Sequence, residues 1–388
     1  MFRSSRTPQP GVFLQMDAAK AAARASGLRV IDLSIGASDL PPPPEALQAL
    51  RESIDDPSTY GYCLKSGTLP FLESATRWYA RRYGLELDPK REALSLIGSQ
   101  EGLAHLLMAV ADPGGVLLMP EVAYPVYFGA AKVAGLEIFP IPLGPDRLPV
   151  LSAIPAETAA RAKVLLLNYP NNPTSAVAGE EFWPLALAFA KRHDLLLVHD
   201  NPYLDQVYAG KAVSPLALPG GRERVVELFS LSKSFHLAGF RLGFALGNAE
   251  ALASLEALKG PIDFNQYLGI QRMGIACLEL PEERLRQETL VWKARAEAMA
   301  DALEAIGWHF ERPRACMYLW DRLPAGLAMD DLEFCQRLVA ETGVALNPGR
   351  SFGPGGVGHV RFALVQPEPV LREAAGLIGE FIRRHARD

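Results

Sequence analysis

Apolar, β-rich runs alternate with helix-like segments along most of this chain, and this alternation restricts its fold more than any other feature. The runs are VIDLSI (30–35), ALSLIG (93–98), GVLLMP (115–120), KVLLLNYP (163–170), LLLVHD (195–200), VVELFSLS (225–232) and GFALG (243–247). Segments with apolar residues three and four positions apart lie between several of them, at 70–84, 101–112, 126–135 and 180–194. Unbroken apolar strands that alternate with helices predict an α/β fold whose mostly parallel central sheet is covered on both faces.

The pattern changes after Gly260, where a long helical stretch at roughly 266–306 leads into a closing segment of mixed α and β character. This change predicts two domains, a large one that holds the central sheet and a smaller α+β one built from both chain ends. We assign residues 1–45 to the N-terminal part of the small domain, 46–280 to the large domain and 281–388 to the C-terminal part of the small domain.

Composition excludes several classes of partner. The 388 residues are 49% hydrophobic and 21% charged, with a net charge of -5, so no basic field would attract nucleic acid or an anionic membrane. No apolar run approaches the ~20 residues that span a bilayer, and the N-terminal segment lacks the apolar core of a targeting signal. Four cysteines without a CxxC pair indicate neither a metal site nor a disulfide framework, and we expect a cytoplasmic protein with reduced thiols.

One lysine, Lys233, lies in the apolar and hydroxyl-rich stretch LFSLSKSFHLAGFRLGF (228–244). Most lysines are solvated surface charges, and that alternative predicts polar neighbours. The neighbours here include Phe229, Leu231, Phe235 and Leu237. We therefore expect a partly buried amine with a lowered pKa, able to act as a nucleophile.

Five polar clusters follow predicted strands: GSQEG (98–102), AYPVY (123–127), NYPNNPTS (168–175), HDNPY (199–203) and SLSKS (230–234). In an open parallel sheet, ligands bind at the carboxyl ends of the strands. Any one cluster could be a loop without a task, but their shared placement makes this less plausible for the set. We expect one rim to carry the side chains of Ser99, Tyr124, Asn172, Asp200, Tyr203 and Lys233.

Together these groups suit an aromatic, phosphorylated aldehyde. Lys233 would form a Schiff base with the aldehyde, and Asp200 would keep a pyridine nitrogen protonated, so that the ring accepts electrons from a substrate carbanion. Tyr203 and Asn172 could hydrogen-bond the ring hydroxyl.

The same set provides a stacking surface and an anion site. Tyr124 offers a flat face to the ring, while the backbone N–H groups of Ser99 and Gln100, at a helix start, would hold the phosphate with Ser230 and Arg241. The sequence therefore predicts a pyridoxal phosphate site.

The stretch SLSKSFHLAGFRLG resembles the lysine signature of class I/II aminotransferases, the fold-type I enzymes that depend on pyridoxal phosphate. The likeness extends over nearly the whole chain, through VIDLSIGASDLPPP, YGYCLKSGTLPFLE and NPGRSFGPGGVGHVRFAL. It implies a fold-type I architecture and ping-pong transfer of an amino group between an α-amino acid and a 2-oxo acid.

The resemblance also implies individual roles. Lys233 would carry the cofactor and move the proton, Arg361 would bind the substrate α-carboxylate, and Gly36 would let that carboxylate approach the backbone. Tyr62 would reach the phosphate of a neighbouring subunit, which implies a homodimer. The peptide bond between Asn172 and its proline is often cis in this family.

Two positions depart from the family pattern, since Ser175 replaces a glycine and Ser38 a proline. Neither change removes a reacting group, so only local turn geometry is in question.

The stretch 258–278 and the motif ACMYLW resemble the subgroup with LL-diaminopimelate, succinyldiaminopimelate and alanine/glutamate–pyruvate aminotransferases. Aspartate-specific relatives place an arginine near Lys259, so we expect glutamate/2-oxoglutarate or alanine/pyruvate as one half of the exchange rather than strict aspartate specificity.

Other interpretations remain open at this stage. A carbon–sulfur lyase would share the cofactor residues and differ only in its substrate pocket. A cofactor-binding regulator normally adds a DNA-binding domain, for which the roughly thirty residues before VIDLSI leave no room. A nicotinamide dehydrogenase would need G-x-G-x-x-G after its first strand, which is not found there. His105 and His236 lie in apolar patterns and are expected to be structural.

Overall fold

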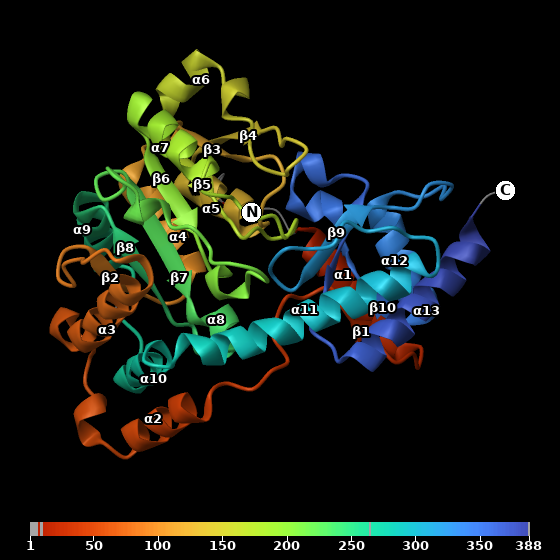
Figure 1. Cartoon of the computed structure of the whole chain (residues 1–388), viewed down its shortest axis with the longest axis horizontal. Coiled ribbons are helices and arrows are strands. Elements are labelled where there is room, and N and C mark those ends of the chain that lie inside the picture. The colour runs from red at the N-terminus through yellow and green to blue at the C-terminus, as the bar shows by residue number, and fades with distance from the viewer. Residues whose placement is uncertain (1–6, 8–10, 264, 387–388) are drawn as a thin grey trace.

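A seven-stranded sheet forms the centre of the larger of two bodies in the computed structural model, which describes residues 7, 11–263 and 265–386 (Figure 1). Its strand order is β2-β8-β7-β6-β5-β3-β4, and all pairs are parallel except the two that involve β8. The predicted α/β fold with a mostly parallel sheet is therefore confirmed. The strands are β2 (Ala93–Leu96), β3 (Val116–Pro120), β4 (Glu137–Ile141), β5 (Ala162–Leu167), β6 (Leu196–Asp200), β7 (Val225–Ser230) and β8 (Gly243–Gly247).

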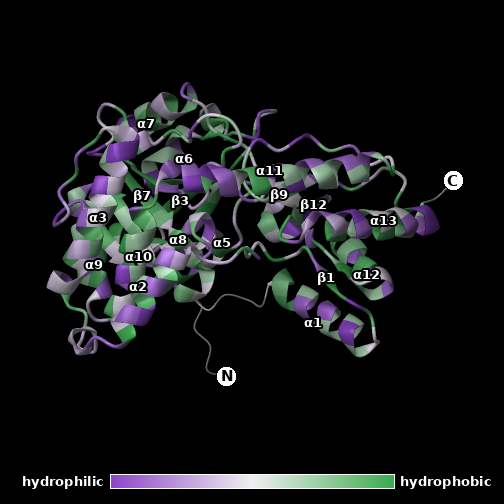
Figure 2. Cartoon of the chain, turned by 60° about the horizontal axis from the view of Figure 1, so that its bottom comes forward, coloured by the Kyte–Doolittle hydropathy of each residue, from purple (hydrophilic) through white to green (hydrophobic). Residues whose placement is uncertain are grey.

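Helices cover both faces of this sheet, and separate hydrophobic clusters fill the two layers. In Figure 2 the strands are largely hydrophobic and the helices carry both colours, as amphipathic helices do. One face packs on α4 (Ser99–Val110), α5 (Val126–Ala134) and α9 (Ala249–Lys259). The other packs on α3 (Lys65–Tyr83), α7 (Phe182–Arg192) and α10 (Leu268–Leu278). The remaining helices of this body are α2 (Pro44–Ile54), α6 (Ala156–Arg161) and α8 (Leu231–Ser234).

The smaller body joins segments from both ends of the chain around a third hydrophobic cluster. Its helices are α1 (Val12–Ala25), α11 (Glu282–Glu304), α12 (Asp331–Thr342) and α13 (Glu368–His385), and α11 runs out of the larger body into it (Figure 1). Its strands are β1 (Ile31–Asp32), β9 (Tyr318–Arg322), β10 (Val344–Ala345), β11 (Asn347–Pro348) and β12 (His359–Ala363). The exact domain boundaries given above remain predictions.

Several elements differ from the sequence prediction, and the helices α1, α2 and α6 were not predicted individually. The helical stretch at 266–306 is two helices, because Pro281 lies between α10 and α11 and caps the second. The run VIDLSI contributes β1, which pairs with β10 outside the central sheet. Strand β4 was not predicted; it is a half-exposed edge strand interrupted by Pro140, so it lacks the apolar pattern of a buried strand.

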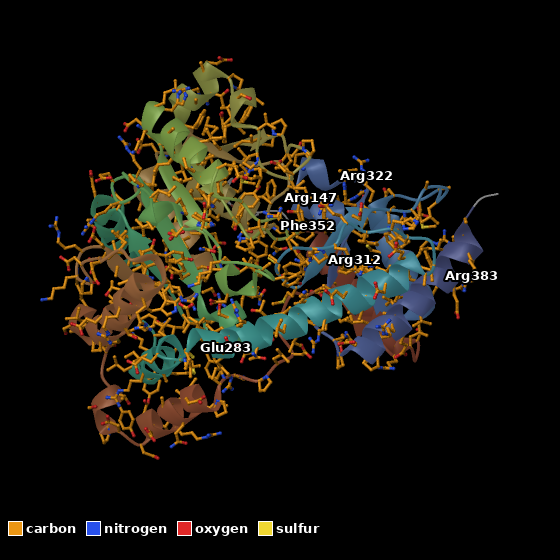
Figure 3. All side chains as sticks on the ribbon, viewed as in Figure 1. Arg147, Glu283, Arg312, Arg322, Phe352 and Arg383 are labelled. Atoms are coloured by element: carbon orange, nitrogen blue, oxygen red, sulfur yellow. The ribbon has the colours of Figure 1, made fainter. Side chains whose placement is uncertain are left out.

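The two bodies meet where the backbone of the smaller one docks on the loop after β3. The Ala123 N–H donates to the Phe352 carbonyl at 2.8 Å, and the Gly355 N–H donates to the Glu121 carbonyl at 3.3 Å. Phe352 lies between the two bodies and packs on Val122 (Figure 3). This contact fixes the loop that carries Tyr124 relative to the strand that carries Arg361.

No helix within the described ranges combines the length and apolar character that a membrane crossing requires. All four cysteines, Cys63, Cys277, Cys316 and Cys335, are free and buried.

Candidate active site

A cavity of about 420 Å³ opens at the carboxyl ends of the parallel strands, where the two bodies meet. It is lined by all the predicted site residues except Tyr62, namely Gly36, Ser99, Gln100, Tyr124, Asn172, Asp200, Tyr203, Ser230, Lys233, Arg241 and Arg361. Tyr62 lies outside it, before α3, and its side chain is 87% exposed. The cavity also includes Tyr127, Asn168, Ser232 and Tyr318, to which the sequence analysis assigned no role.

Lys233 is presented to the cavity by the short helix α8, which begins directly after β7. The Ser230 hydroxyl caps this helix by accepting a hydrogen bond from the Ser232 N–H at 3.2 Å. The Lys233 ammonium donates to the carbonyl of Gly36. Burial, and then the positive charge of Arg361, lower the pKa of Lys233 to about 8. About one amine in ten is therefore neutral at pH 7, far more than for an ordinary lysine.

Asp200 ends strand β6, and burial raises the pKa of its carboxyl to about 6. The Tyr127 hydroxyl donates to Oδ2 at 2.6 Å, and Asn168 Nδ2 donates to the main-chain oxygen of Asp200 at 2.7 Å. Oδ1 is buried and makes no hydrogen bond of ordinary length with the described residues, although the Ser99 side chain is close enough to help lower the pKa of the carboxyl. The cavity therefore presents a carboxylate oxygen that can accept from a ligand N–H.

Arg361 lies in the middle of β12 and is 3% exposed. Its guanidinium donates to Asn172 Oδ1 at 2.9 Å and to the Ser34 carbonyl at 2.6 Å. Cζ lies 4.5 Å from the centroid of the Tyr318 ring and 4.9 Å from that of the Phe352 ring. Aromatic rings and two acceptors thus hold a buried cation whose charge is not balanced by a carboxylate in these contacts, which suits an anionic ligand.

Another part of the cavity lining offers donors that suit an anion. Ser99 begins α4, so the N–H groups of the first helical turn point into the cavity. Arg241, in the left-handed region at φ 53°, lies so close to Gly98 that a Cβ there would overlap its guanidinium. Ser232 Oγ is buried without a partner among the described residues. These donors can together surround a phosphate group.

Tyr203 and Tyr318 lie next to each other in the cavity wall. Their hydroxyl oxygens are 2.8 Å apart, and burial raises the pKa of Tyr203 well above its usual value. A Cβ on Gly36 would overlap the Tyr318 hydroxyl, so a glycine is needed there. Tyr124 packs edge-to-face on Tyr127, with ring centroids 5.6 Å apart.

The serines at the two positions that depart from the family pattern, Ser175 and Ser38, are both held by hydrogen bonds of their side chains. Ser175 adopts the left-handed φ of 56° that a glycine would favour, and its hydroxyl donates to the Tyr318 carbonyl at 2.9 Å. The Ser38 hydroxyl hydrogen-bonds His236 Nδ1 at 2.7 Å and accepts from the Leu40 N–H at 3.1 Å. The Asn172–Pro173 bond is cis, as is the Tyr169–Pro170 bond.

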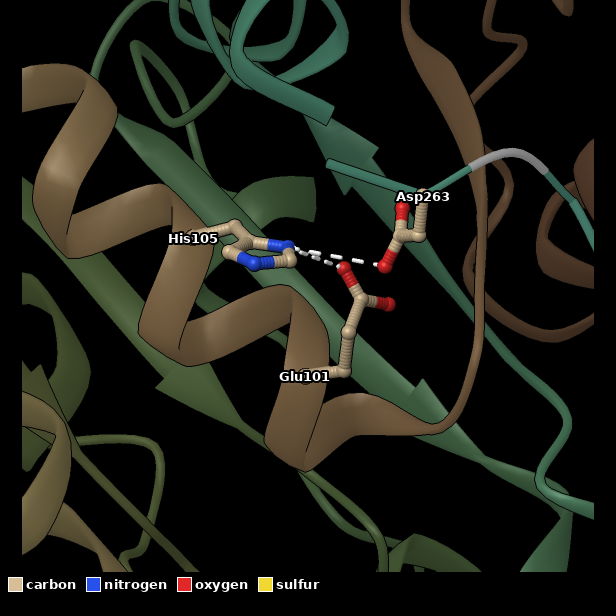
Figure 4. A group of neighbouring side chains, drawn as sticks. All are labelled: Glu101, His105 and Asp263. Atoms are coloured by element: carbon tan, nitrogen blue, oxygen red, sulfur yellow. Dashed lines mark hydrogen bonds and ion pairs between the residues drawn. The ribbon is translucent and has the colours of Figure 1, made fainter. Parts of the chain in front are cut away.

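Glu101, His105 and Asp263 bring three groups that could bind a metal close together (Figure 4). His105 Nδ1 lies 2.6 Å from Glu101 Oε1. The Lys259 ammonium, in a residue only 5% exposed, lies 2.6 Å from Glu101 and 2.7 Å from Asp263. The lysine therefore supplies the cation for these carboxylates, and its own charge is neutralised within the chain.

This parallel α/β fold, with a lysine of lowered pKa and a buried arginine facing one cavity, is that of an enzyme that acts on small anionic molecules. The family model described as aminotransferase class I and II matches residues 29–378. The chain belongs to this family and is an aminotransferase of fold type I.

Named relatives agree with this membership. The chain is 42% identical to the LL-diaminopimelate aminotransferase of Syntrophobacter fumaroxidans over 94% of both chains. It is 38% identical to the glutamate-pyruvate aminotransferase AlaC of Escherichia coli, covering 96% of this chain and 91% of that protein. A solved structure, described as a probable N-succinyldiaminopimelate aminotransferase from Thermus thermophilus, is 61% identical with a TM-score of 0.91, covering 95% of this chain and 99% of that one.

Proposed function

We propose that this aminotransferase uses pyridoxal 5′-phosphate to exchange an amino group between an α-amino acid and a 2-oxo acid by a ping-pong mechanism. The buried, unpartnered Oδ1 of Asp200 carries the proposal, because an acceptor left unsatisfied inside a cavity calls for a ligand donor. A protonated pyridine nitrogen is such a donor, and its positive charge would favour ionised Asp200.

The remaining cavity groups fit the same cofactor. The start of α4, Arg241 and the hydroxyls of Ser230 and Ser232 would hold its phosphate. Tyr124 would stack on the ring, and Asn172 and Tyr203 would face the ring oxygen. Lys233 is the amine that would bond to the aldehyde.

When bound, the cofactor supplies an aldehyde that combines with amines and a ring that accepts electrons from the substrate α-carbon. Lys233, once a substrate amine takes its place on the aldehyde, would be the base that takes the α-proton and returns it to the cofactor carbon, which its lowered pKa favours. Arg361 orients the substrate by holding its α-carboxylate. The Tyr318 and Phe352 rings beside Arg361 would keep its charge and that of the substrate carboxylate away from bulk water, which would screen their attraction.

For the substrate, we propose glutamate/2-oxoglutarate or alanine/pyruvate as one half of the exchange, with a diaminopimelate-type amino acid as a candidate for the other. The names of the relatives support this choice. Lys259 supports it further, because it is buried and paired within its own subunit and so does not offer the second cation of aspartate-specific enzymes.

We also propose a cytoplasmic homodimer in which Tyr62 reaches the phosphate of the neighbouring subunit. Its support is the family resemblance together with the exposure of Tyr62 and its neighbours Tyr60 and Leu64, at 87%, 65% and 55%. Sedimentation equilibrium would give the mass, and mixing a Lys233→Ala chain with a Tyr62→Ala chain would restore activity only if sites are shared between subunits.

The first experiment is a visible spectrum of the purified enzyme, titrated with single amino acids in the absence of any keto acid. A visible band that is lost on addition of one amino acid, with release of its keto acid, would show the first half of the exchange and identify the donor. A band that no common amino acid converts would favour the lyase alternative, which cystathionine tests: release of pyruvate and ammonia without an acceptor would support it. No band after addition of pyridoxal phosphate would contradict the proposal.

A further inference from the structure

Tyr318 lies inside the cavity although its motif, ACMYLW, has no obvious catalytic feature. It begins β9 and pairs with Ala363 of β12, two residues beyond Arg361. The residue is 1% exposed. Its hydroxyl is 2.8 Å from that of Tyr203 and lies against Gly36. The ring therefore packs in the smaller body while the hydroxyl contacts residues of the site.

The two phenols share one hydrogen bond, so one hydroxyl donates and the other keeps its proton for a different acceptor. Burial raises the pKa of both, but Arg361, 4.5 Å above the Tyr318 ring, limits the pKa of Tyr318 to about 12. Either hydroxyl can be the donor at this distance, and the lower pKa of Tyr318 favours Tyr318. When Tyr318 donates, the Tyr203 proton is left to face the cavity.

We infer that Tyr318 is a positioning residue that acts through Tyr203, directing the Tyr203 proton toward the ring oxygen of the bound cofactor. The inference rests on the proposed function, in which Tyr203 faces that oxygen. Without the Tyr318 hydroxyl, the Tyr203 hydroxyl would be free to rotate, and it would donate to the ring oxygen for less of the time.

The pH dependence of the visible absorbance of the holoenzyme tests the inference, because a hydrogen bond to the ring oxygen favours its deprotonated form. We expect Tyr203→Phe to raise the midpoint by about 1 pH unit or more, and Tyr318→Phe to raise it by about half as much; 1 pH unit corresponds to about 1.4 kcal/mol. The double variant should have the midpoint of Tyr203→Phe, because both changes remove the same donor.

Tyr79→Phe is the matched control, since it removes a fully buried hydroxyl that bonds Ser214 away from the cavity. It should leave the midpoint unchanged even if it lowers stability. An unshifted midpoint in Tyr318→Phe would overturn the inference, and so would additive shifts in the double variant, which would show independent action. Either result leaves the proposed function intact, whereas a wild-type protein without a visible band would contradict both.

Discussion

The Tyr127 hydroxyl donates a 2.6 Å hydrogen bond to Oδ2 of Asp200, while Oδ1 of the same carboxylate remains unpartnered among the described residues. The hydrogen bond from Tyr127 orients the carboxylate, and Oδ1 is available to accept a hydrogen bond from a ligand. Tyr127 comes from α5 and Asp200 from β6, so the packing of that helix on the sheet sets the orientation of the acid.

Tyr127→Phe should weaken cofactor binding by about 10-fold or more, because a hydrogen bond to a charged group contributes about 1.5–3 kcal/mol. The loss also raises the pKa of Asp200, which opposes its ionised form. Equilibrium titration of the cofactor-free enzyme with pyridoxal phosphate measures the change. Tyr169→Phe is the control, since its hydroxyl bonds the Arg147 carbonyl. Equal affinity in Tyr127→Phe and wild type would contradict the role.

The contribution of Asp200 to the stability of the cofactor-free enzyme should fall as pH rises from about 4 to 6. Its folded pKa, about 6, is raised above the usual 3.8 by burial, so the protonated form favours folding and the contribution is lost as pH rises through that window. The loss is about 3 kcal/mol. Urea unfolding of wild type and Asp200→Asn at pH 4 and 7 measures it. A pH-independent difference between the two proteins would contradict the prediction.

Lys233 should be the most readily acylated lysine of the cofactor-free enzyme near pH 8, where about half of its amines are neutral. Lys293, whose side chain is exposed and pairs with Glu297, serves as the internal control. Peptide mapping after limited acetylation compares them. Pyridoxal phosphate should protect Lys233 alone, and Lys233→Ala should abolish transamination; surviving turnover would contradict the assignment.

Arg361→Lys should lower kcat/KM for the amino acid by about 100-fold or more, because an ammonium cannot replace a two-pronged guanidinium between Asn172 and the Ser34 carbonyl. Arg322→Lys, on the exposed end of the adjacent strand β9, is the matched control (Figure 3). Steady-state kinetics distinguish them. Similar losses in both variants would indicate general damage to the sheet.

Lys259→Met should lower the free energy of unfolding by about 2 kcal/mol, somewhat less than the ~3–5 kcal/mol for a fully buried pair, because Glu101 and Asp263 remain partly exposed. Denaturant unfolding measures this change.

Incubation of the wild type with a chelator should leave activity unchanged, since the Lys259 ammonium already neutralises Glu101 and Asp263 where a metal ion would bind. Activity that a chelator removes and a metal restores would contradict this view.

The sequence identified many residues of the cavity because its polar clusters follow strands, and parallel strands end at one edge of a sheet. The roles of Gly36 and Arg361 came from the family resemblance. No role was assigned to Tyr127 and Asn168, although both lie within the predicted polar clusters, or to Tyr318, which lies in an apolar stretch. Their contribution depends on the direction of each side chain after helix, loop and strand have packed, and no local pattern contains that direction.

The amino-acid sequence by itself determined the alternation of strands and helices and the chemistry available at the strand ends, since both depend on local pattern. Tertiary structure decided which groups meet: Arg361 bonds the carbonyl of Ser34, 327 residues away, and Lys233 bonds that of Gly36. It also gave the acid and amine of the site their shifted pKa values, because burial and neighbouring charges exist only in the folded chain.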